Sequence, residues 1–157
     1  MNIFQSSLGF LGRALLSVIF IASAVGKIMD WQGTLQFFNQ SLTNWLALNV
    51  GNTFFQPLLE WSLENSSTLL LAAVIFELLG GALVFLGLWV RLGAVLLILF
   101  LVPTTMVFHH FWELQGDERH MQMIHFMKNL SICGGLLYVL AMGKGFCRKS
   151  SKHSEAK

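Results

Sequence analysis

The sequence predicts an all-α integral membrane protein, a four-helix bundle with interfacial helices between spans one and two. Of its 157 residues, 55% are hydrophobic and only 11% are charged, whereas a soluble domain carries about 25% charged residues. The mean hydropathy is +0.64. Crossing a hydrocarbon core of roughly 30 Å takes about 20 apolar residues per helix. The stretches that meet this length lie at about 9–28, 68–89, 92–110 and 123–142.

The first stretch allows two interpretations. Ala22-Ser23-Ala24 resembles the small-residue cleavage site of a secretory signal peptide. However, the first positive charge is Arg13, inside the stretch rather than ahead of it. An uncleaved first span fits this pattern better, so residues 1–142 are expected to form one four-span transmembrane domain.

Residues 29–67 are too polar to cross a membrane and too aromatic for a free loop. A stripe of apolar residues at helical spacing predicts an amphipathic helix lying in the outer interface, and Gly51-Asn52 ends it. Residues 54–67 then predict a second short interfacial helix. The stripe consists of Leu35, Phe38, Leu42, Trp45 and Leu46.

The positions of lysine and arginine predict the orientation, because cytoplasmic segments carry the excess of positive charge. With four spans, both termini and the turn at 89–91 share one side, which is therefore expected to be cytoplasmic. Residues 143–157 are expected to be a basic, disordered tail on that side. The tail is interpreted as a topology signal, so no nucleic-acid partner is expected. The positive charges on this side are Arg13, Arg91, Lys144, Arg148, Lys149, Lys152 and Lys157.

Glu77 is the one carboxylate near the middle of a predicted span. An ionisable group at that depth costs a few kcal/mol and usually faces the bundle interior. Helical spacing places Glu77 on one face with Gly80 and Gly81, and small residues allow helices to approach closely. The predicted close-packing positions are Gly80, Gly81, Gly87, Gly134 and Gly135.

The other spans offer basic partners for Glu77, with Arg13 toward the inner side and Lys27 and Lys128 toward the outer side. Two interpretations stay open. Glu77 is either a buried staple that holds the helices in register, or part of a polar cavity that binds a ligand, a proton or a quinone. The candidates for ligand binding or proton handling are Glu77, Lys128, His109, Arg13, Lys27 and Asn129.

The histidines near the outer surface suggest metal binding only weakly. His109, His110 and His125 form no H-x-x-x-H pair within a span and no cysteine joins them, so no metal is expected. A haem held between His109 and His125 is the other arrangement they suggest. Cys133 and Cys147 are too far apart for a C-x-x-C redox pair.

The motifs together resemble the DoxX family of small bacterial membrane proteins. In chain order they are Gly12-Arg13, Gly26-Lys27, FELLGGALVFLGLWVRLGA at 76–94, VFHHF at 107–111, and HFMKNLSICGGLLYVL at 125–140. The resemblance covers about 9–142 and implies a four-helix bundle in the bacterial cytoplasmic, or inner, membrane. It also implies a loose link to redox systems, since the family includes a subunit of thiosulfate:quinone oxidoreductase. The segment 29–67 is longer than the resemblance leads us to expect.

The function favoured by these observations is that of a membrane subunit or partner of a quinone- or sulfur-linked redox system, with a polar site around Glu77. The chain has no flavin, dinucleotide or haem motif, so another protein subunit, membrane-bound or soluble, would supply the chemistry. The cofactor is open, with a quinone as one option. The alternatives are a non-enzymatic scaffold, an assembly factor or a small transporter component. Whether the chain is an enzyme is open, and besides the bilayer a second copy of the chain is a further candidate partner.

Overall fold

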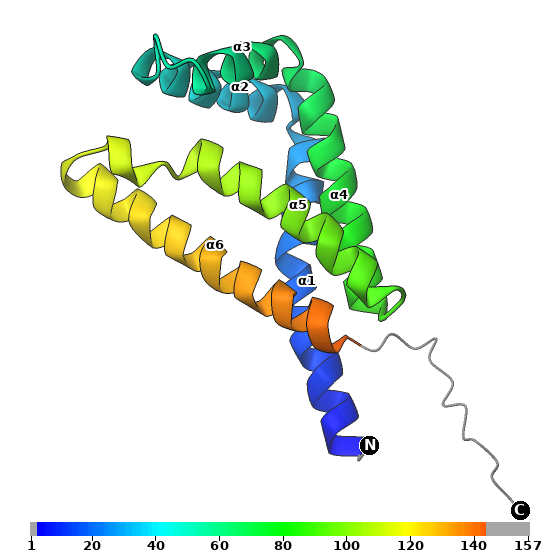
Figure 1. The fold of residues 1–157 in the computed structure, drawn as a ribbon. Coiled ribbons are helices and arrows are strands. Elements are labelled where there is room, and N and C mark those ends of the chain that lie inside the picture. Colours follow the sequence, from blue (N-terminus) through cyan, green and yellow to red (C-terminus); the bar gives the residue numbers. More distant parts are fainter. Residues whose placement is uncertain (1–2, 144–157) are drawn as a thin grey trace, which may run out of the picture.

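The structure, a computed structural model, describes residues 3–143, and every regular element in this part of the chain is a helix, as predicted (Figure 1). The predicted tail lies, from residue 144 on, outside the described residues. The elements are α1 (Ile3–Met29), α2 (Trp31–Leu48), α3 (Phe55–Glu64), α4 (Ser66–Leu86), α5 (Val90–Phe108), the short 3-10 helix η1 (Phe111–Glu113) and α6 (Gly116–Met142).

Within the described residues, four helical segments are long and apolar enough to cross a membrane. The start of α1, the α4–α5 turn and the end of α6 lie at one end of the molecule, and the α2–α3 layer and the α5–α6 connection lie toward the other (Figure 1). This is the up-and-down arrangement of a four-span protein. The segments are Phe4–Met29, Ser66–Leu86, Val90–Glu113 and Gly116–Met142.

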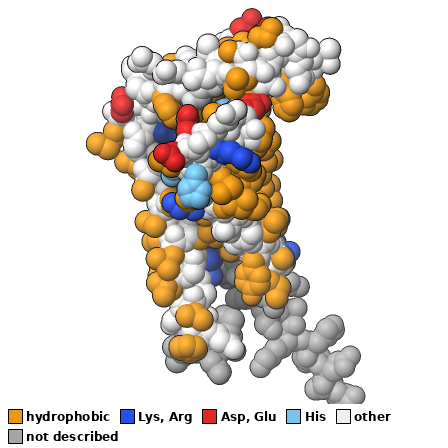
Figure 2. Space-filling view, turned by 90° about the vertical axis from the view of Figure 1, so that its left-hand side faces the viewer, with side chains coloured by type: hydrophobic (Ala, Val, Ile, Leu, Met, Phe, Trp, Pro, Cys, Tyr) orange, Lys and Arg blue, Asp and Glu red, His pale blue; other side chains and the backbone are white. Residues whose placement is uncertain are grey.

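Side-chain chemistry follows the same division. Figure 2 shows charged side chains concentrated in the upper half of one face, with hydrophobic side chains covering much of the lower half. Only Leu136 is buried on α6, and exposed apolar side chains such as Leu130, Leu137 and Tyr138 are available to lipid. The bilayer is therefore the natural surrounding of this helix.

The turn between α4 and α5 is set by Gly87. Its φ of +73° is left-handed, a conformation that glycine adopts without steric cost, and it ends α4 at Leu86 as a C-terminal cap. The amide of Leu88 then donates to the carbonyl of Leu83 at 3.0 Å. Gly87 was predicted to pack helices together within a span; it instead terminates the helix.

Two glycines at the middle of α4 let a helix approach on each side. A Cβ placed on Gly80 would lie 2.9 Å from Cγ of Leu97 on α5, and one on Gly81 would lie 2.9 Å from Cγ1 of Ile21 on α1. Both distances are shorter than carbon atoms tolerate. The predicted role of Gly80 and Gly81 in close helix packing therefore agrees with the geometry.

The remaining glycines behave differently from one another. Gly93 on α5, which the sequence did not single out, approaches the backbone of α4 closely, since its Cβ would lie 2.9 Å from the carbonyl oxygen of Gly80. A Cβ on Gly135 would make an ordinary contact of 3.6 Å with Leu16, and one on Gly134 would meet nothing within 4 Å. Gly134 is thus not a close-packing position in this chain.

The main apolar core lies where α1, α4, α5 and α6 come together, and Phe20, Val84, Leu97 and Leu136 are buried in it. α1 and α6 meet near Leu16, which contacts the Gly135 position. Beyond that point α6 leans away from α1 toward the α5–α6 connection (Figure 1). The axes of α1 and α6 consequently come together at one end of the bundle and diverge at the other (Figure 1).

The α2–α3 layer has a small core of its own. Asp30 caps α2 by accepting from the amide of Gly33 at 3.0 Å. Leu42 and Trp45 of α2 are buried against Leu59 of α3. The apolar stripe predicted to face the membrane interface thus packs in part against the next helix.

Candidate functional site

Lys27 and Glu77 form an ion pair between α1 and α4. Nζ of Lys27 lies 2.8 Å from Oε2 and 3.0 Å from Oε1 of Glu77. The Glu77 side chain is 1% exposed and that of Lys27 is 20% exposed. Among the three bases that the sequence offered to Glu77, the structure therefore pairs it with Lys27.

The surroundings hold the ammonium group of Lys27 in place. The hydroxyl of Ser23, one helical turn earlier on α1, accepts a hydrogen bond from Nζ. The ring of Phe100 on α5 lies with its centroid 5.3 Å from Nζ, within reach of a cation–π interaction. Three helices thus contribute to the position of one charge.

A pocket of about 160 Å³ borders this ion pair. All four spans line it, so its shape depends on the whole bundle. The walls combine two charged side chains, two hydroxyls and one amide with aliphatic and aromatic groups. The lining residues are Ile19, Phe20, Ser23, Lys27, Glu77, Phe100, Leu101, Thr104, Asn129 and Ile132.

Asn129 reaches the pocket from α6 and is tied to α5. Its Nδ2 donates to Oγ1 of Thr105 at 3.0 Å, and Thr105 in turn donates to the carbonyl of Leu101 at 2.7 Å. Thr104, which also lines the pocket, donates to the carbonyl of Phe100 at 2.8 Å. The polar side chains of α5 and α6 are therefore oriented by bonds outside the pocket.

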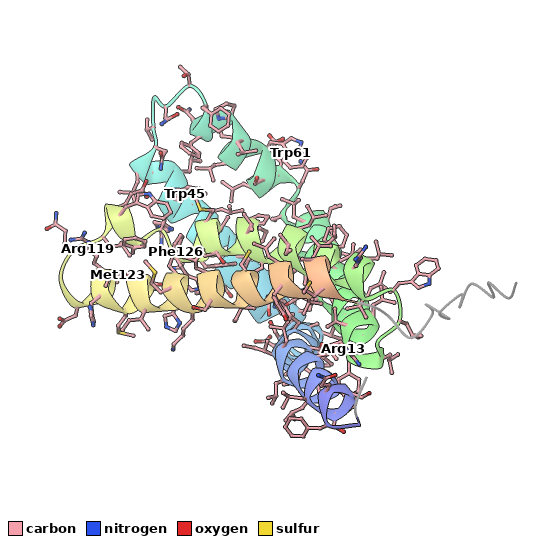
Figure 3. The ribbon with its side chains drawn as sticks, turned by 60° about the horizontal axis from the view of Figure 1, so that its bottom comes forward. Arg13, Trp45, Trp61, Arg119, Met123 and Phe126 are labelled. Atoms are coloured by element: carbon pink, nitrogen blue, oxygen red, sulfur yellow. The ribbon has the colours of Figure 1, made fainter. Side chains whose placement is uncertain are left out.

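Arg13 and Lys128, the other predicted partners of Glu77, do not meet it. A Cβ on Gly87 would lie 3.4 Å from Nη2 of Arg13, so Arg13 sits at the C-terminal end of α4, where a positive charge is favourable. That end is about 15 Å along the helix from Glu77. Lys128 is exposed on α6. Figure 3 shows Arg13 on α1, far from Trp45 and the α2–α3 layer.

His109 and His125 stack face to face, with ring centroids 5.2 Å apart and planes inclined by 17°. Nδ1 of His109 is hydrogen-bonded to Oε1 of Gln122 at 2.7 Å. Histidine binds a metal through nitrogens in the plane of its ring, and stacked faces do not direct these nitrogens at an ion between them. The haem arrangement suggested by the sequence does not fit this geometry.

His110 belongs to a separate cluster at the α2–α5 contact. Its ring stacks on Trp45 with centroids 5.6 Å apart, and Nε2 lies 4.0 Å from Oε2 of Glu113. Oε1 of Glu113 accepts from Nε1 of Trp45 and from Nδ2 of Asn49, each at 3.3 Å. Among the described residues, no three His, Cys, Asp or Glu side chains gather as a metal would require. This cluster instead fastens α2 to the α5–α6 connection.

Sequence reasoning missed several pocket residues. Ser23 and Thr104 carry hydroxyls that are ordinary in apolar helices, so nothing distinguished them by composition. A signal for Ser23 existed in its spacing, because it lies four residues before Lys27 and hence one turn away. Phe100 gave no signal among the many apolar residues of α5.

The fold and the pocket define an integral membrane protein built from a four-helix bundle with an internal ion pair. The sequence model of the DoxX family matches residues 8–110, which reach from α1 to the end of α5. The chain is also similar to the inner membrane protein YphA of Escherichia coli strain K12, with 30% identity over 137 residues that cover 86% of this chain and 82% of that protein. The chain therefore belongs to the DoxX family.

These comparisons bear on the sequence predictions. The DoxX resemblance is confirmed, and so is the expected location, because the relative is an inner membrane protein and the described residues include four candidate spans. No solved structure shows significant similarity to the chain.

Proposed function

We propose that the pocket binds the ring of a quinone-like molecule and that this DoxX-family protein is the membrane partner of a redox enzyme. The observation that carries the proposal is the pocket itself, which all four spans line and which has the Lys27–Glu77 pair on its wall. An apolar cavity of about 150 Å³ holds one benzene molecule. A pocket of about 160 Å³ thus has room for one six-membered ring.

The open side of the pocket supports a lipid-soluble ligand. Ile19 and Ser23 line the pocket from α1 and are exposed, so the pocket reaches the surface of the bundle beside α1. At membrane depth such an opening leads to the acyl chains. A ring with a long apolar tail could enter there and leave its tail in the lipid.

The combination of polar groups favours a ligand over a purely structural ion pair. A staple between α1 and α4 would account for Lys27 and Glu77. It would not account for Thr104 and Asn129, which line the same pocket from α5 and α6. Polar side chains that converge in an otherwise apolar pocket are typical of small-molecule sites.

Electrons would come from another protein. The 157 residues contain no flavin, dinucleotide or haem motif, and the pocket offers hydrogen bonds rather than redox groups. The distribution of positive charge supports cytoplasmic termini, and with that orientation the α2–α3 layer would lie on the outer side. A partner enzyme would then exchange electrons with the pocket ligand rather than with this chain.

A second candidate function is a scaffold or assembly factor, and the α2–α3 layer favours it. This layer exposes Phe37, Phe54 and Trp61, with exposed fractions of 60%, 71% and 53%. Aromatic side chains of this kind also suit the headgroup region of a bilayer. If the protein is a scaffold, its pocket binds no ligand. Substitution of the polar pocket residues would then change only the free energy of unfolding of the bundle.

The proposal is tested by binding to the purified protein in nanodiscs. Decylubiquinone and, without oxygen, its reduced form are titrated by equilibrium dialysis against the wild type, Glu77→Gln and the matched control Lys128→Met, which alters an exposed charge outside the pocket. We expect saturable binding, and Glu77→Gln should weaken binding of the reduced, hydroxyl-bearing form about tenfold, the effect of one hydrogen bond to a charged group, while Lys128→Met binds as wild type. If neither decylubiquinone nor its reduced form binds saturably to the wild type, the proposal fails.

A further inference from the structure

We infer that the pocket prefers the reduced, dihydroxy form of its ring ligand to the quinone form, with Glu77 and Asn129 accepting the two hydroxyl hydrogens. The inference rests on the proposed function, because it concerns the ligand of the same pocket. It follows from an account of which hydrogen-bonding groups in the pocket are already committed and which are free.

The donors of Lys27 are fully used. An ammonium group has three N–H bonds, and Nζ of Lys27 donates to Ser23 and to both carboxylate oxygens of Glu77. A quinone carbonyl can only accept. To donate to it, Lys27 would have to give up one of these bonds, so the exchange would yield little net free energy.

The carboxylate of Glu77 has acceptor capacity to spare. A carboxylate offers about four lone-pair positions; Lys27 approaches the two oxygens once each, and the Ser23 hydroxyl takes up a third position. A ligand hydroxyl can therefore donate to Glu77 without displacing Lys27. Such a bond to a charged acceptor is about twice as strong as one between neutral groups.

The network on α5 fixes which end of the Asn129 amide is free. Thr105 donates its hydroxyl hydrogen to the carbonyl of Leu101, so its oxygen can only accept. The atom of Asn129 that faces Thr105 must then be the nitrogen, as the 3.0 Å bond from Nδ2 has it. This leaves Oδ1 of Asn129 as an acceptor on a residue that lines the pocket.

Thr104 adds a further acceptor. Its hydrogen is committed to the carbonyl of Phe100, so its hydroxyl oxygen can only accept from a ligand. The free donor in the pocket is one N–H of Asn129, because the Ser23 hydroxyl is engaged with the carboxylate of Glu77. Acceptors therefore prevail, and a ring with two hydroxyls satisfies them, whereas a ring with two carbonyls does not.

The test compares decylubiquinol with decylubiquinone on the wild-type protein in nanodiscs, without oxygen, by equilibrium dialysis. We expect the quinol to bind about tenfold more tightly, the difference that one hydrogen bond to a charged acceptor makes. If the quinone binds as tightly or more tightly, the inference is wrong while the proposed function stands. If neither binds, the proposed function itself has failed.

A substitution at Asn129 measures how much this residue contributes to the preference for the quinol. Asn129→Leu removes the second acceptor at similar side-chain volume, and we expect it to lower the quinol-to-quinone affinity ratio about threefold, while the bond to Glu77 keeps the ratio above one. Ser131→Ala, on the same helix but outside the pocket lining, is the matched control and should keep the ratio of the wild type. If Asn129→Leu kept the quinol-to-quinone affinity ratio of the wild type, Asn129 would not be an acceptor for the ligand hydroxyl. The wild-type comparison of quinol with quinone needs no variant, so it can overturn the inference even if Asn129→Leu misfolds.

Discussion

Nζ of Lys27 lies 2.8 Å from Oε2 of Glu77 and joins α1 to α4 across 50 positions of the chain. Removing one member leaves the other as an unpaired charge inside the bundle, which costs more than the pair itself contributes. Lys27 is partly exposed, so the penalty falls mainly on Glu77. The pair therefore makes the stability of the bundle sensitive to single substitutions and less sensitive to a matched double substitution.

The first prediction follows from this asymmetry. Lys27→Met should lower the free energy of unfolding by about 3 kcal/mol, because it strands the carboxylate of Glu77. The double variant Lys27→Met/Glu77→Leu should recover most of the loss. Unfolding of the detergent-solubilised protein, followed by helical circular dichroism, measures both. Strictly additive effects of the two substitutions would show that the groups are not coupled.

Glycine substitutions provide the second prediction. Gly93→Ala should cost about 1–3 kcal/mol, because the new Cβ would lie 2.9 Å from the backbone oxygen of Gly80 and backbone cannot move aside easily. Gly134→Ala is the matched control, since its Cβ would meet nothing within 4 Å. The same unfolding measurement compares them. Equal stability of the two variants would mean that α4 and α5 do not pack as closely as described.

Much of the fold was readable because membrane spans depend on long runs of one property. Hydropathy alone located four apolar helices, and one acidic residue in such a run was enough to single out Glu77. The basic residue that pairs with Glu77 could not be predicted from the sequence. Arg13, Lys27 and Lys128 were all expected near the inner faces of their spans. Selecting among them requires the rotation and tilt of each helix, which arise from packing.

The same limit explains why the sequence did not predict the contacts of several glycines and apolar residues. Gly93 makes a close contact and Gly134 does not, although both are glycines inside apolar helices. Leu42 and Trp45 form part of an apolar stripe that either lipid or a neighbouring helix can cover, and Leu59 of α3 covers them here. A one-dimensional pattern reports that a face is apolar; it does not report what covers it.

The third prediction concerns Glu113, which holds the α2–α3 layer in position. Glu113→Ala should remove both hydrogen bonds, from Trp45 and from Asn49, at a cost of about 1–3 kcal/mol. Amide hydrogen exchange in α2 should then become faster. Glu118→Ala, an exposed acid at the start of α6, should leave that exchange unchanged. Unaltered protection of α2 in Glu113→Ala would show that the cluster does not fasten the layer.

The fourth prediction tests the orientation that the positive charges imply. In a Cys133→Ser/Cys147→Ser background, Asp117→Cys places a thiol in the exposed first turn of α6 and Leu88→Cys places one in the exposed α4–α5 turn. A membrane-impermeant maleimide added to intact spheroplasts should label residue 117 at once and residue 88 only after the membrane is permeabilised. The two positions lie at opposite ends of the spans, so each serves as the other's control. The reverse labelling pattern would place the α2–α3 layer in the cytoplasm, and any redox partner on that side would then have to be a cytoplasmic protein.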